Sequence, residues 1–287
     1  MSWSIEDKVV MITGGNSGIG KATAAELARR GALVTITARD PAKGAEAADE
    51  IRVATGAEVA VGILDLSSLD SVRAFSAEFA SEHQRIDVLI NNAGTMSGKR
   101  RTTPDGFEWT FGVNYLGPFL LTNLLMPRLL ESAPSRVITV SSENYRTAKK
   151  GLDFDDLQME DGFSPSKAYA ASKMATILFT VELDRRFRGS GVAAWALHPG
   201  VVATSFGKGP DGSKMMGLVM TGLKPFLRKP ERGAATSVYL ATAEGAALEE
   251  GIYWSNEAPK EPIAVAVDED AAARLWLESE RMVGLAT

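Results

Sequence analysis

Short apolar runs alternate with amphipathic stretches along the first third of the chain. Four apolar runs have the length of buried strands, at residues 8–13, 33–38, 58–66 and 86–94. The stretches between them repeat apolar side chains every three or four positions, at residues 19–31, 41–56 and 68–84. This spacing is typical of helices that pack one face on a sheet. Strands that alternate with helices predict a parallel sheet with helices on both of its faces.

The alternation continues to the end of the chain. The expected elements are a helix over 104–130, a strand over 135–142, a helix over 165–188, a strand over 191–200 and a short strand over 251–255. Two long connections, 143–164 and 201–229, each follow the carboxyl end of a strand, which is where open parallel sheets bind ligands. No linker or repeat divides the chain. We therefore expect one doubly wound Rossmann-type α/β domain over 1–287, with about seven strands and a substrate-side lid at 201–229.

The composition excludes several classes of protein. A net charge of -5 gives no electrostatic footprint for nucleic acid. The chain has no cysteine and two histidines, which argues against disulfides, thiolate chemistry and a histidine-rich metal site, so no metal is predicted. Its first residues lack a basic region followed by an apolar run, and no stretch approaches 18 apolar residues. We expect no membrane span and a cytoplasmic protein.

A glycine-rich segment joins the first strand to the first helix. It reads Thr13-Gly14-Gly15-Asn16-Ser17-Gly18-Ile19-Gly20, with glycines at 14, 18 and 20. Glycines allow a sharp turn and a close approach of the backbone to a ligand. The helix that follows presents free amides and a positive dipole to a phosphate. The segment predicts a dinucleotide site, and a glycine-rich turn without a ligand is the alternative.

The end of the second strand discriminates between two dinucleotides. An acidic residue there binds the ribose 2′-hydroxyl of NAD, whereas an arginine accommodates the 2′-phosphate of NADP. The chain has Ala38 where the acid is expected, followed by Arg39. Asp40 precedes a proline and fits a helix cap better than a ribose ligand. The sequence favours NADP(H) over NAD, unless Arg39 is simply a surface charge.

Tyr169 and Lys173 lie four residues apart on the helix expected over 165–188. That spacing is about one turn, so both side chains project from the same face. A phenol beside an ammonium has a tuned acidity and suits the protonation of a carbonyl oxygen. Alone, this pair occurs by chance on many amphipathic helices.

Together and in order, the motifs resemble those of the classical short-chain dehydrogenase/reductase family over almost the whole chain. The resemblance rests on TGxxxGIG at 13–20, NNAG at 91–94, Ser142, the Tyr169–Lys173 pair, and Pro199-Gly200. It implies the Rossmann-type fold and hydride transfer between a nicotinamide and a carbonyl or alcohol substrate.

The resemblance also implies roles for four residues. Tyr169 would be the general acid or base, and Lys173 would lower the tyrosine pKa and bind the nicotinamide ribose. Ser142, chosen over Ser141 by the family alignment, would bind the substrate oxygen. Asn114 would hold a proton-relay water beside the lysine.

Further cofactor contacts follow from the same resemblance. Asp65 and Leu66 would lie at the adenine, Asn91 and Gly94 near the adenosine ribose, and Thr204 at the nicotinamide carboxamide. The set is completed by Ala93, Pro199, Gly200 and Val202. Asp65 could instead cap the helix that begins near Ser67, and Thr204 could be an ordinary turn residue.

Several longer stretches resemble the retinol dehydrogenase-like branch of the family. They are residues 105–142, 153–158, 197–204, 251–262 and 271–280. Two departures count against assigning a retinoid as the substrate. Pro118 stands where this branch usually has histidine, and the N-terminal anchoring segment of many such enzymes is not found.

The segment 205–228 is rich in methionine and other apolar residues, including Met215, Met216 and Met220. It suits a lipophilic substrate, although apolar residues at helical spacing can equally belong to the core. We expect an NADP(H)-dependent carbonyl–alcohol oxidoreductase. The alternatives are a catalytically silent NADP-binding sensor or scaffold, and a reductase of carbon–carbon double bonds. The helices at 104–130 and 165–188 could pair in a homo-oligomer or simply pack on the sheet.

Overall fold

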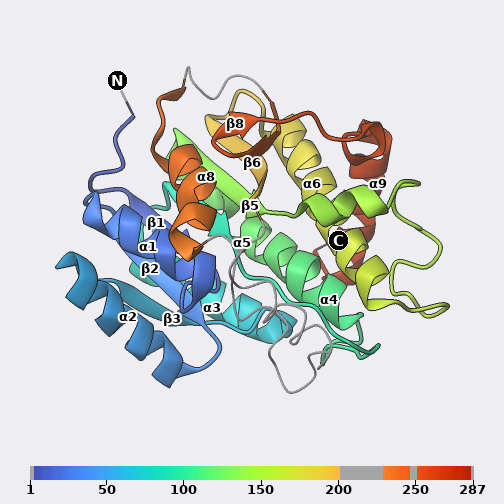
Figure 1. The fold of residues 1–287 in the computed structure, drawn as a ribbon, viewed down its shortest axis with the longest axis horizontal. Helices are drawn as coiled ribbons and strands as arrows, with labels where there is room; N and C mark the ends of the chain where they lie inside the picture. The colour runs from blue at the N-terminus through green and yellow to red at the C-terminus, as the bar shows by residue number, and fades with distance from the viewer. Residues whose placement is uncertain (1–2, 201–228, 246–250, 286–287) are drawn as a thin grey trace.

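The computed structural model describes residues 3–200, 229–245 and 251–285. These residues form a central sheet with helices on both faces (Figure 1). The strand order is β3-β2-β1-β4-β5-β6-β7-β8, which confirms the doubly wound α/β fold.

The first seven strands are parallel, and β8 is an antiparallel edge strand. The strands are β1 (Val9–Ile12), β2 (Leu33–Ala38), β3 (Ala60–Ile63), β4 (Val88–Asn91), β5 (Ser135–Val140), β6 (Val192–His198), β7 (Tyr253–Ser255) and β8 (Ala258–Pro259). The sequence predicted about seven strands and missed β8, which is two residues long. A tight turn joins β7 to β8, and its residues Asn256 and Glu257 have left-handed φ angles of 55° and 61°.

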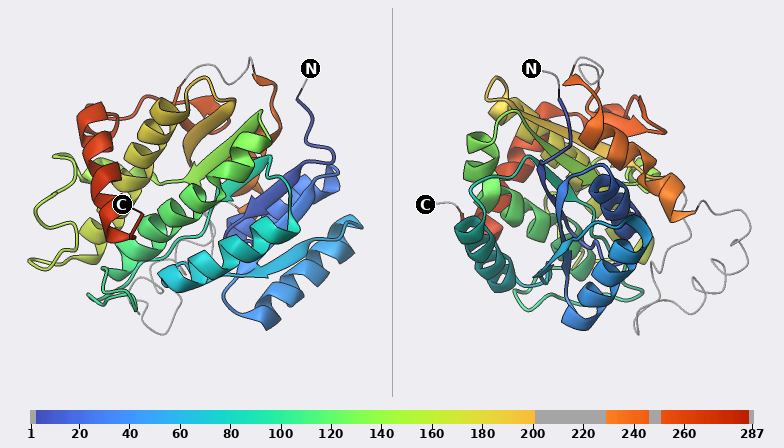
Figure 2. Two further views of the ribbon diagram at one scale, coloured as in Figure 1. Left: turned by 180° about the vertical axis from the view of Figure 1, so that it is seen from behind. Right: turned by 90° about the vertical axis from the view of Figure 1, so that its left-hand side faces the viewer.

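One face of the sheet is covered by α1 (Gly18–Arg29), α2 (Pro41–Thr55) and α8 (Pro230–Thr242). The other face is covered by α3 (Leu69–Glu82), α5 (Gly117–Glu131) and α6 (Pro165–Phe187), with α9 (Glu269–Met282) outside α6 (Figure 2). Side chains of one strand alternate between the two layers: Val10 and Ile12 join the first, and Val9 and Met11 join the second. This double burial explains why the strands are continuous apolar runs.

The helix predicted over 104–130 is broken and starts later than expected. Glu108 caps a short helix, α4 (Trp109–Phe111), by accepting hydrogen bonds from the amides of Thr110 (3.0 Å) and Phe111 (2.7 Å). A π-helical turn, η1 (Gly112–Leu116), then leads into α5. Pro118 has no N–H to donate to the carbonyl of residue 114, so an uninterrupted α-helical ladder cannot pass through this point.

Helix α9 packs on α5 and α6 through aromatic rings. The indole of Trp276 stacks on Phe179 at 5.7 Å and meets Phe119 edge-on at 5.0 Å. The hydroxyl oxygens of Tyr115 and Ser279 lie 2.6 Å apart and share a hydrogen bond. α9 thereby covers part of the two helices that were considered for oligomer contacts. In the described ranges, no helix is long and apolar enough to cross a membrane.

Candidate active site

The carboxyl ends of the central strands bring the family motifs together. β1 leads into the glycine segment, β4 ends at Asn91, β5 leads into Ser141-Ser142, and β6 ends at His198 before Pro199-Gly200. β1, β4, β5 and β6 are consecutive neighbours in the sheet, so these segments share one edge. Helix α6, which carries Tyr169 and Lys173, packs against β5 and β6 beside them.

Tyr169, Ser142 and Lys173 lie together. The Tyr169 side chain is hydrogen-bonded to the Ser142 side chain. The Lys173 ammonium lies 5.8 Å from the centre of the Tyr169 ring, and its Nζ donates to the carbonyl oxygen of Val140 at 2.8 Å. Lys173 is buried, whereas Tyr169 keeps part of its side chain accessible. The arrangement places a phenol and a serine hydroxyl where they can bind one oxygen atom.

Burial dominates the acidity of both titratable groups. It raises the pKa of Tyr169 to about 12, against a smaller lowering by the hydrogen bond with Ser142. Burial also lowers the pKa of Lys173 to about 8. The pKa of Tyr169 is raised, and not lowered as the family resemblance implies, because of burial, while Lys173 Nζ is directed at the Val140 carbonyl oxygen. At neutral pH Tyr169 therefore carries its proton.

Asn114 lies in the π-helical turn, and its side-chain amide makes three hydrogen bonds. Oδ1 accepts from the Thr95 amide at 2.7 Å, and Nδ2 donates to the Thr95 carbonyl at 2.9 Å. Nδ2 also donates to Ser172 Oγ at 3.0 Å, and Ser172 is the neighbour of Lys173 on α6. This side chain ties the turn to α6. Sequence reasoning missed Thr95 and Ser172, although both adjoin motif residues.

The glycine segment fits a dinucleotide. Gly14 and Gly18 have φ angles of 63° and 55°, which favour glycine. A Cβ on Gly20 would lie 2.4 Å from Asn92 Nδ2 and 2.5 Å from the Gly14 carbonyl oxygen. Ser17 begins α1 without a side-chain cap, so the first amides of α1 are not used by it. Such a helix start suits a phosphate. Asn16 and Ile19 lie in the same segment and are partly accessible.

The NNAG segment is fastened to this loop. Asn92 Nδ2 donates to the Thr13 carbonyl at 2.8 Å, and the Ala93 amide donates to Thr13 Oγ1 at 3.0 Å. Gly94 is exposed, and a Cβ added to it would lie 3.6 Å from Lys173 Nζ and 3.7 Å from Asn114 Oδ1. Its missing side chain keeps space open beside Lys173, where a cofactor ribose would fit.

Asn91, by contrast, turns its side chain away from that space. It is buried, and Nδ2 donates to Thr122 Oγ1 on α5 at 2.9 Å. We expected Asn91 near the adenosine ribose. The structure leaves only its backbone, and not its side chain, in a position to border the cofactor.

The residues expected at the adenosine end are also explained by the structure. Arg39 is exposed directly after β2. Asp40 caps α2 by accepting from the amides of Ala42 (3.0 Å) and Lys43 (3.3 Å), as predicted. Asp65 Oδ1 accepts from the amide and hydroxyl of Ser67 at 2.9 and 2.7 Å, beside buried Leu66. The cap of α3 is instead Ser68, whose Oγ accepts from the Ser71 amide at 3.3 Å, so the alternative reading of Asp65 as the cap of this helix is wrong.

Two of the predicted cofactor contacts, Val202 and Thr204, lie outside the described residues, as does the expected lid apart from Lys229. Pro199 and Gly200 are described and partly accessible, and Gly200 has a φ of 83°. Across the described ranges, no three acidic or histidine side chains gather closely enough to hold a metal ion.

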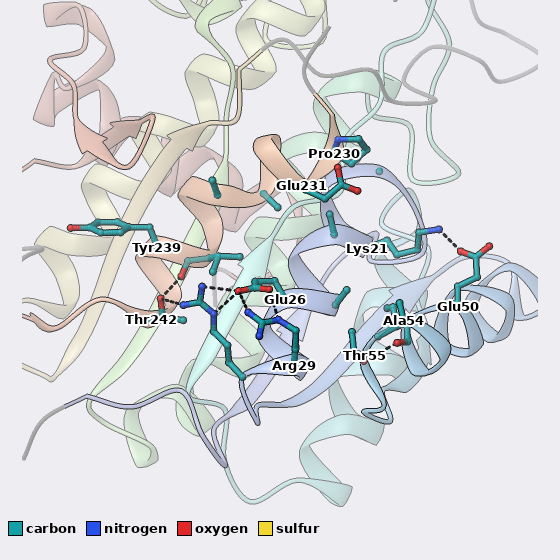
Figure 3. Close-up of a pocket in the computed structure, with 18 of the residues that line it drawn as sticks. Lys21, Glu26, Arg29, Glu50, Ala54, Thr55, Pro230, Glu231, Tyr239 and Thr242 are labelled. Atoms are coloured by element: carbon teal, nitrogen blue, oxygen red, sulfur yellow. Dashed lines mark hydrogen bonds and ion pairs between the residues drawn. The ribbon is translucent and has the colours of Figure 1, made fainter.

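A separate hollow lies between α1, α2 and α8 (Figure 3). Five of its charged lining residues pair with one another: Lys21 with Glu50, and Glu26 with Arg29 and Arg30. Its uncharged lining includes five alanines, from α1, α2 and α8. Neither Tyr169 nor Lys173 lines it, so we place the active site at the strand ends and not in this hollow.

Comparisons with known proteins identify the family of this chain. The family model for short chain dehydrogenase matches residues 8–153. Human Retinol dehydrogenase 13 is 47% identical, over 98% of this chain and 86% of its own length. Human Retinol dehydrogenase 14 is 44% identical, over 97% of this chain and 87% of its own length.

Solved structures agree as well. A protein from Mycobacterium Paratuberculosis has a TM-score of 0.77 and 36% identity, covering 99% of this chain and 98% of that one. A metagenomic short-chain oxidoreductase in complex with NADP has a TM-score of 0.61 and 27% identity, covering 84% and 92%. The chain therefore belongs to the short-chain dehydrogenase family, in its retinol dehydrogenase-like branch, and is an oxidoreductase of alcohol and carbonyl groups.

Proposed function

We propose that this chain is an NADP(H)-dependent reductase of lipophilic aldehydes or ketones that also catalyses the reverse alcohol oxidation. The observation that carries the proposal is the hydrogen-bonded Tyr169–Ser142 pair beside buried Lys173. A phenol that is protonated at neutral pH is the donor that carbonyl reduction requires.

The chain's own residues have distinct parts in this reaction. A bound nicotinamide supplies the hydride and accepts it in the reverse direction. Ser142 binds the substrate oxygen and stabilises the charge that develops on it. Tyr169 transfers its proton to that oxygen, and Lys173 holds a positive charge close to the phenolate that is left. The Asn114 amide keeps the adjoining turn in register with α6.

NADP(H) is favoured by the adenosine end of the site. Arg39 is exposed after β2, where it can pair with a 2′-phosphate. The carboxylate of Asp40 is engaged in capping α2 and is not available to a ribose 2′-hydroxyl. The NADP complex of the metagenomic relative is consistent with this preference.

A lipophilic substrate is supported by the relatives, whose names refer to retinol. The proposal extends to lipophilic carbonyl compounds as a class and not to retinal alone, because Pro118 departs from the histidine of the branch.

The test is oxidation of NADPH and NADH by the purified chain with retinal and other lipophilic aldehydes, ketones and quinones. Tyr169→Phe should lower kcat by roughly 10²- to 10⁴-fold while NADPH still binds. Tyr239→Phe on α8 is the matched control and should keep full turnover. Tight NADPH binding without turnover on any compound would count against the reductase and favour a sensor.

A further inference from the structure

The residue that follows Ser142, Glu143, receives three hydrogen bonds on its carboxylate. Oε1 accepts from the Tyr253 hydroxyl at 2.9 Å. Oε2 accepts from Arg146 Nε at 2.9 Å and lies 2.9 Å from Lys260 Nζ. A carboxylate with three donors, two of them cationic, is held in one orientation.

Two of the three donors come from a distant part of the chain. Arg146 belongs to the same short 3₁₀ helix, η2 (Glu143–Thr147), but Tyr253 lies on β7 and Lys260 follows β8. Glu143 therefore fastens the segment after β5 to residues more than 100 positions away. The stretch 251–262, which resembles the retinol dehydrogenase-like branch, includes both partners.

Further contacts fix the same segment to the same stretch. Arg146 donates through NH2 to the Glu261 carbonyl at 2.9 Å. The Tyr145 hydroxyl accepts from the Ile263 amide at 3.3 Å. The buried rings of Tyr145 and Tyr253 meet edge-on at 5.4 Å. The segment is thus clamped by polar and aromatic contacts.

Glu143 is charged when it makes these contacts. Burial raises the pKa of its carboxyl, but the hydrogen bonds from Lys260, Tyr253 and Arg146 outweigh this and lower it overall. Its side chain is 28% exposed, so the interaction with the two cations is only partly screened.

The clamp acts one peptide bond from the catalytic serine. Ser142 caps η2, and its Oγ accepts from the Asn144 amide at 3.3 Å. The Glu143 amide donates to His198 Nδ1 at 3.3 Å, which fixes the peptide between the two residues. The backbone next to Ser142 is thus held by His198, and the Glu143 side chain that follows it is held by Tyr253, Arg146 and Lys260.

We propose that Glu143 is a positioning residue of the reaction: through Tyr253 and Lys260, it orients Ser142 toward Tyr169. This rests on the proposed carbonyl–alcohol activity. The stretch around β7 and β8 would then contribute to catalysis indirectly, because Tyr253 and Lys260 contact Glu143 and not the substrate oxygen.

The test uses the full chain with NADPH and a carbonyl compound that the wild type reduces. Glu143→Gln should lower kcat at least about tenfold, because a small misplacement of a catalytic group has a large kinetic cost. The dissociation constant of NADPH should not change. Tyr253→Phe, which removes one donor and keeps the ring, should lower kcat in the same direction. Glu131→Gln is the matched control, since Glu131 also pairs with an arginine three residues away, Arg128, but on the far end of α5.

A double-variant experiment separates positioning from a general structural effect. If Glu143 acts through Ser142, Glu143→Gln should add no further loss of kcat in the Ser142→Ala background. An equal loss in both backgrounds would overturn the proposal, as would full kcat in Glu143→Gln.

Amide hydrogen exchange provides a readout that does not depend on turnover. Residues 142–147 should exchange faster in Glu143→Gln than in the wild type, and at the wild-type rate in Glu131→Gln. Unchanged protection in Glu143→Gln would overturn the clamp even if no carbonyl compound were reduced. Lack of turnover by the wild type, in contrast, would count only against the proposed function.

Discussion

The ammonium of Lys173 donates to the carbonyl oxygen of Val140 at 2.8 Å, in the buried space between α6 and β5. Burial lowers the lysine pKa from 10.5 to about 8, which corresponds to a cost of about 3 kcal/mol in the protonated folded state. The hydrogen bond to Val140 stabilises the folded state by about 1 kcal/mol, and a variant without the lysine side chain loses this contribution.

We expect Lys173→Met to remove the activity and, at pH 7, to raise the free energy of unfolding by up to about 2 kcal/mol. Below pH 8 the lysine is protonated in both states, so the cost is fully present. As the pH rises from 8 to 10.5 the folded lysine loses its proton first, and the cost disappears. The advantage of the variant should therefore shrink over that range.

Urea unfolding of wild type and variant at several pH values measures this difference. Lys167→Met, at an exposed position of the same helix, is the control and should change stability little. A Lys173→Met protein that is less stable than wild type at pH 7 would contradict the expectation.

Gly20 is expected to be irreplaceable in the glycine segment. A Cβ there would meet the Gly14 carbonyl at 2.5 Å, and this backbone cannot move without opening the loop. Gly20→Ala should cost roughly 1–3 kcal/mol of stability and weaken NADPH binding measured by calorimetry. Gly56→Ala is the matched control: its φ of 75° makes it strained, but a Cβ there meets nothing. It should lose stability and keep wild-type affinity for NADPH.

The exposed guanidinium of Arg39 is expected to set the dinucleotide preference. Arg39→Ala should raise the Kd of NADPH by roughly 10- to 100-fold, the value of a hydrogen-bonded charge pair, and leave that of NADH nearly unchanged. Arg52→Ala removes a charge from α2 that pairs with Asp49 and should affect neither constant. Equal weakening of both dinucleotides would show that Arg39 does not read the 2′-phosphate.

The turn between β7 and β8 contains a residue in an unfavourable conformation. Glu257 has a φ of 61°, which costs a side-chain-bearing residue about 1 kcal/mol relative to glycine. Glu257→Gly should therefore maintain or raise the melting temperature, despite the added freedom of glycine in the unfolded chain. Glu261→Gly, outside that φ region, should lower it. A clear loss of stability in Glu257→Gly would show that its side chain has a stabilising contact.

The elements that the sequence predicted well are those with a single local cause. β2 begins and ends where its apolar run does, at Leu33 and Ala38. α2 begins at Pro41, the first residue of its predicted range 41–56, and Gly56 caps its end in the left-handed region. In both cases the signal lies within the element itself.

The elements that the sequence analysis predicted wrongly or missed depend on residues in other parts of the chain. The break before α5 depends on Pro118, whose effect falls on a carbonyl four residues earlier. β8 is too short for a periodic signal and exists only because β7 lies beside it. At the site, the motifs predicted Ser142, Tyr169 and Lys173, which the structure brings together. The motifs gave no signal for the contacts of Glu143, because its partners Tyr253 and Lys260 are brought to it only by folding.

The π-helical turn at Gly112–Leu116 makes the number of residues in this segment as important as their identity. A π turn contains one residue more than the α turn it replaces, so deleting a residue here would convert the π turn into an α turn. Everything before the deletion would then rotate by about 100° relative to α5. The Asn114 amide would leave Thr95 and Ser172. Substitutions at the neighbouring positions can be absorbed by repacking, whereas a change of length cannot.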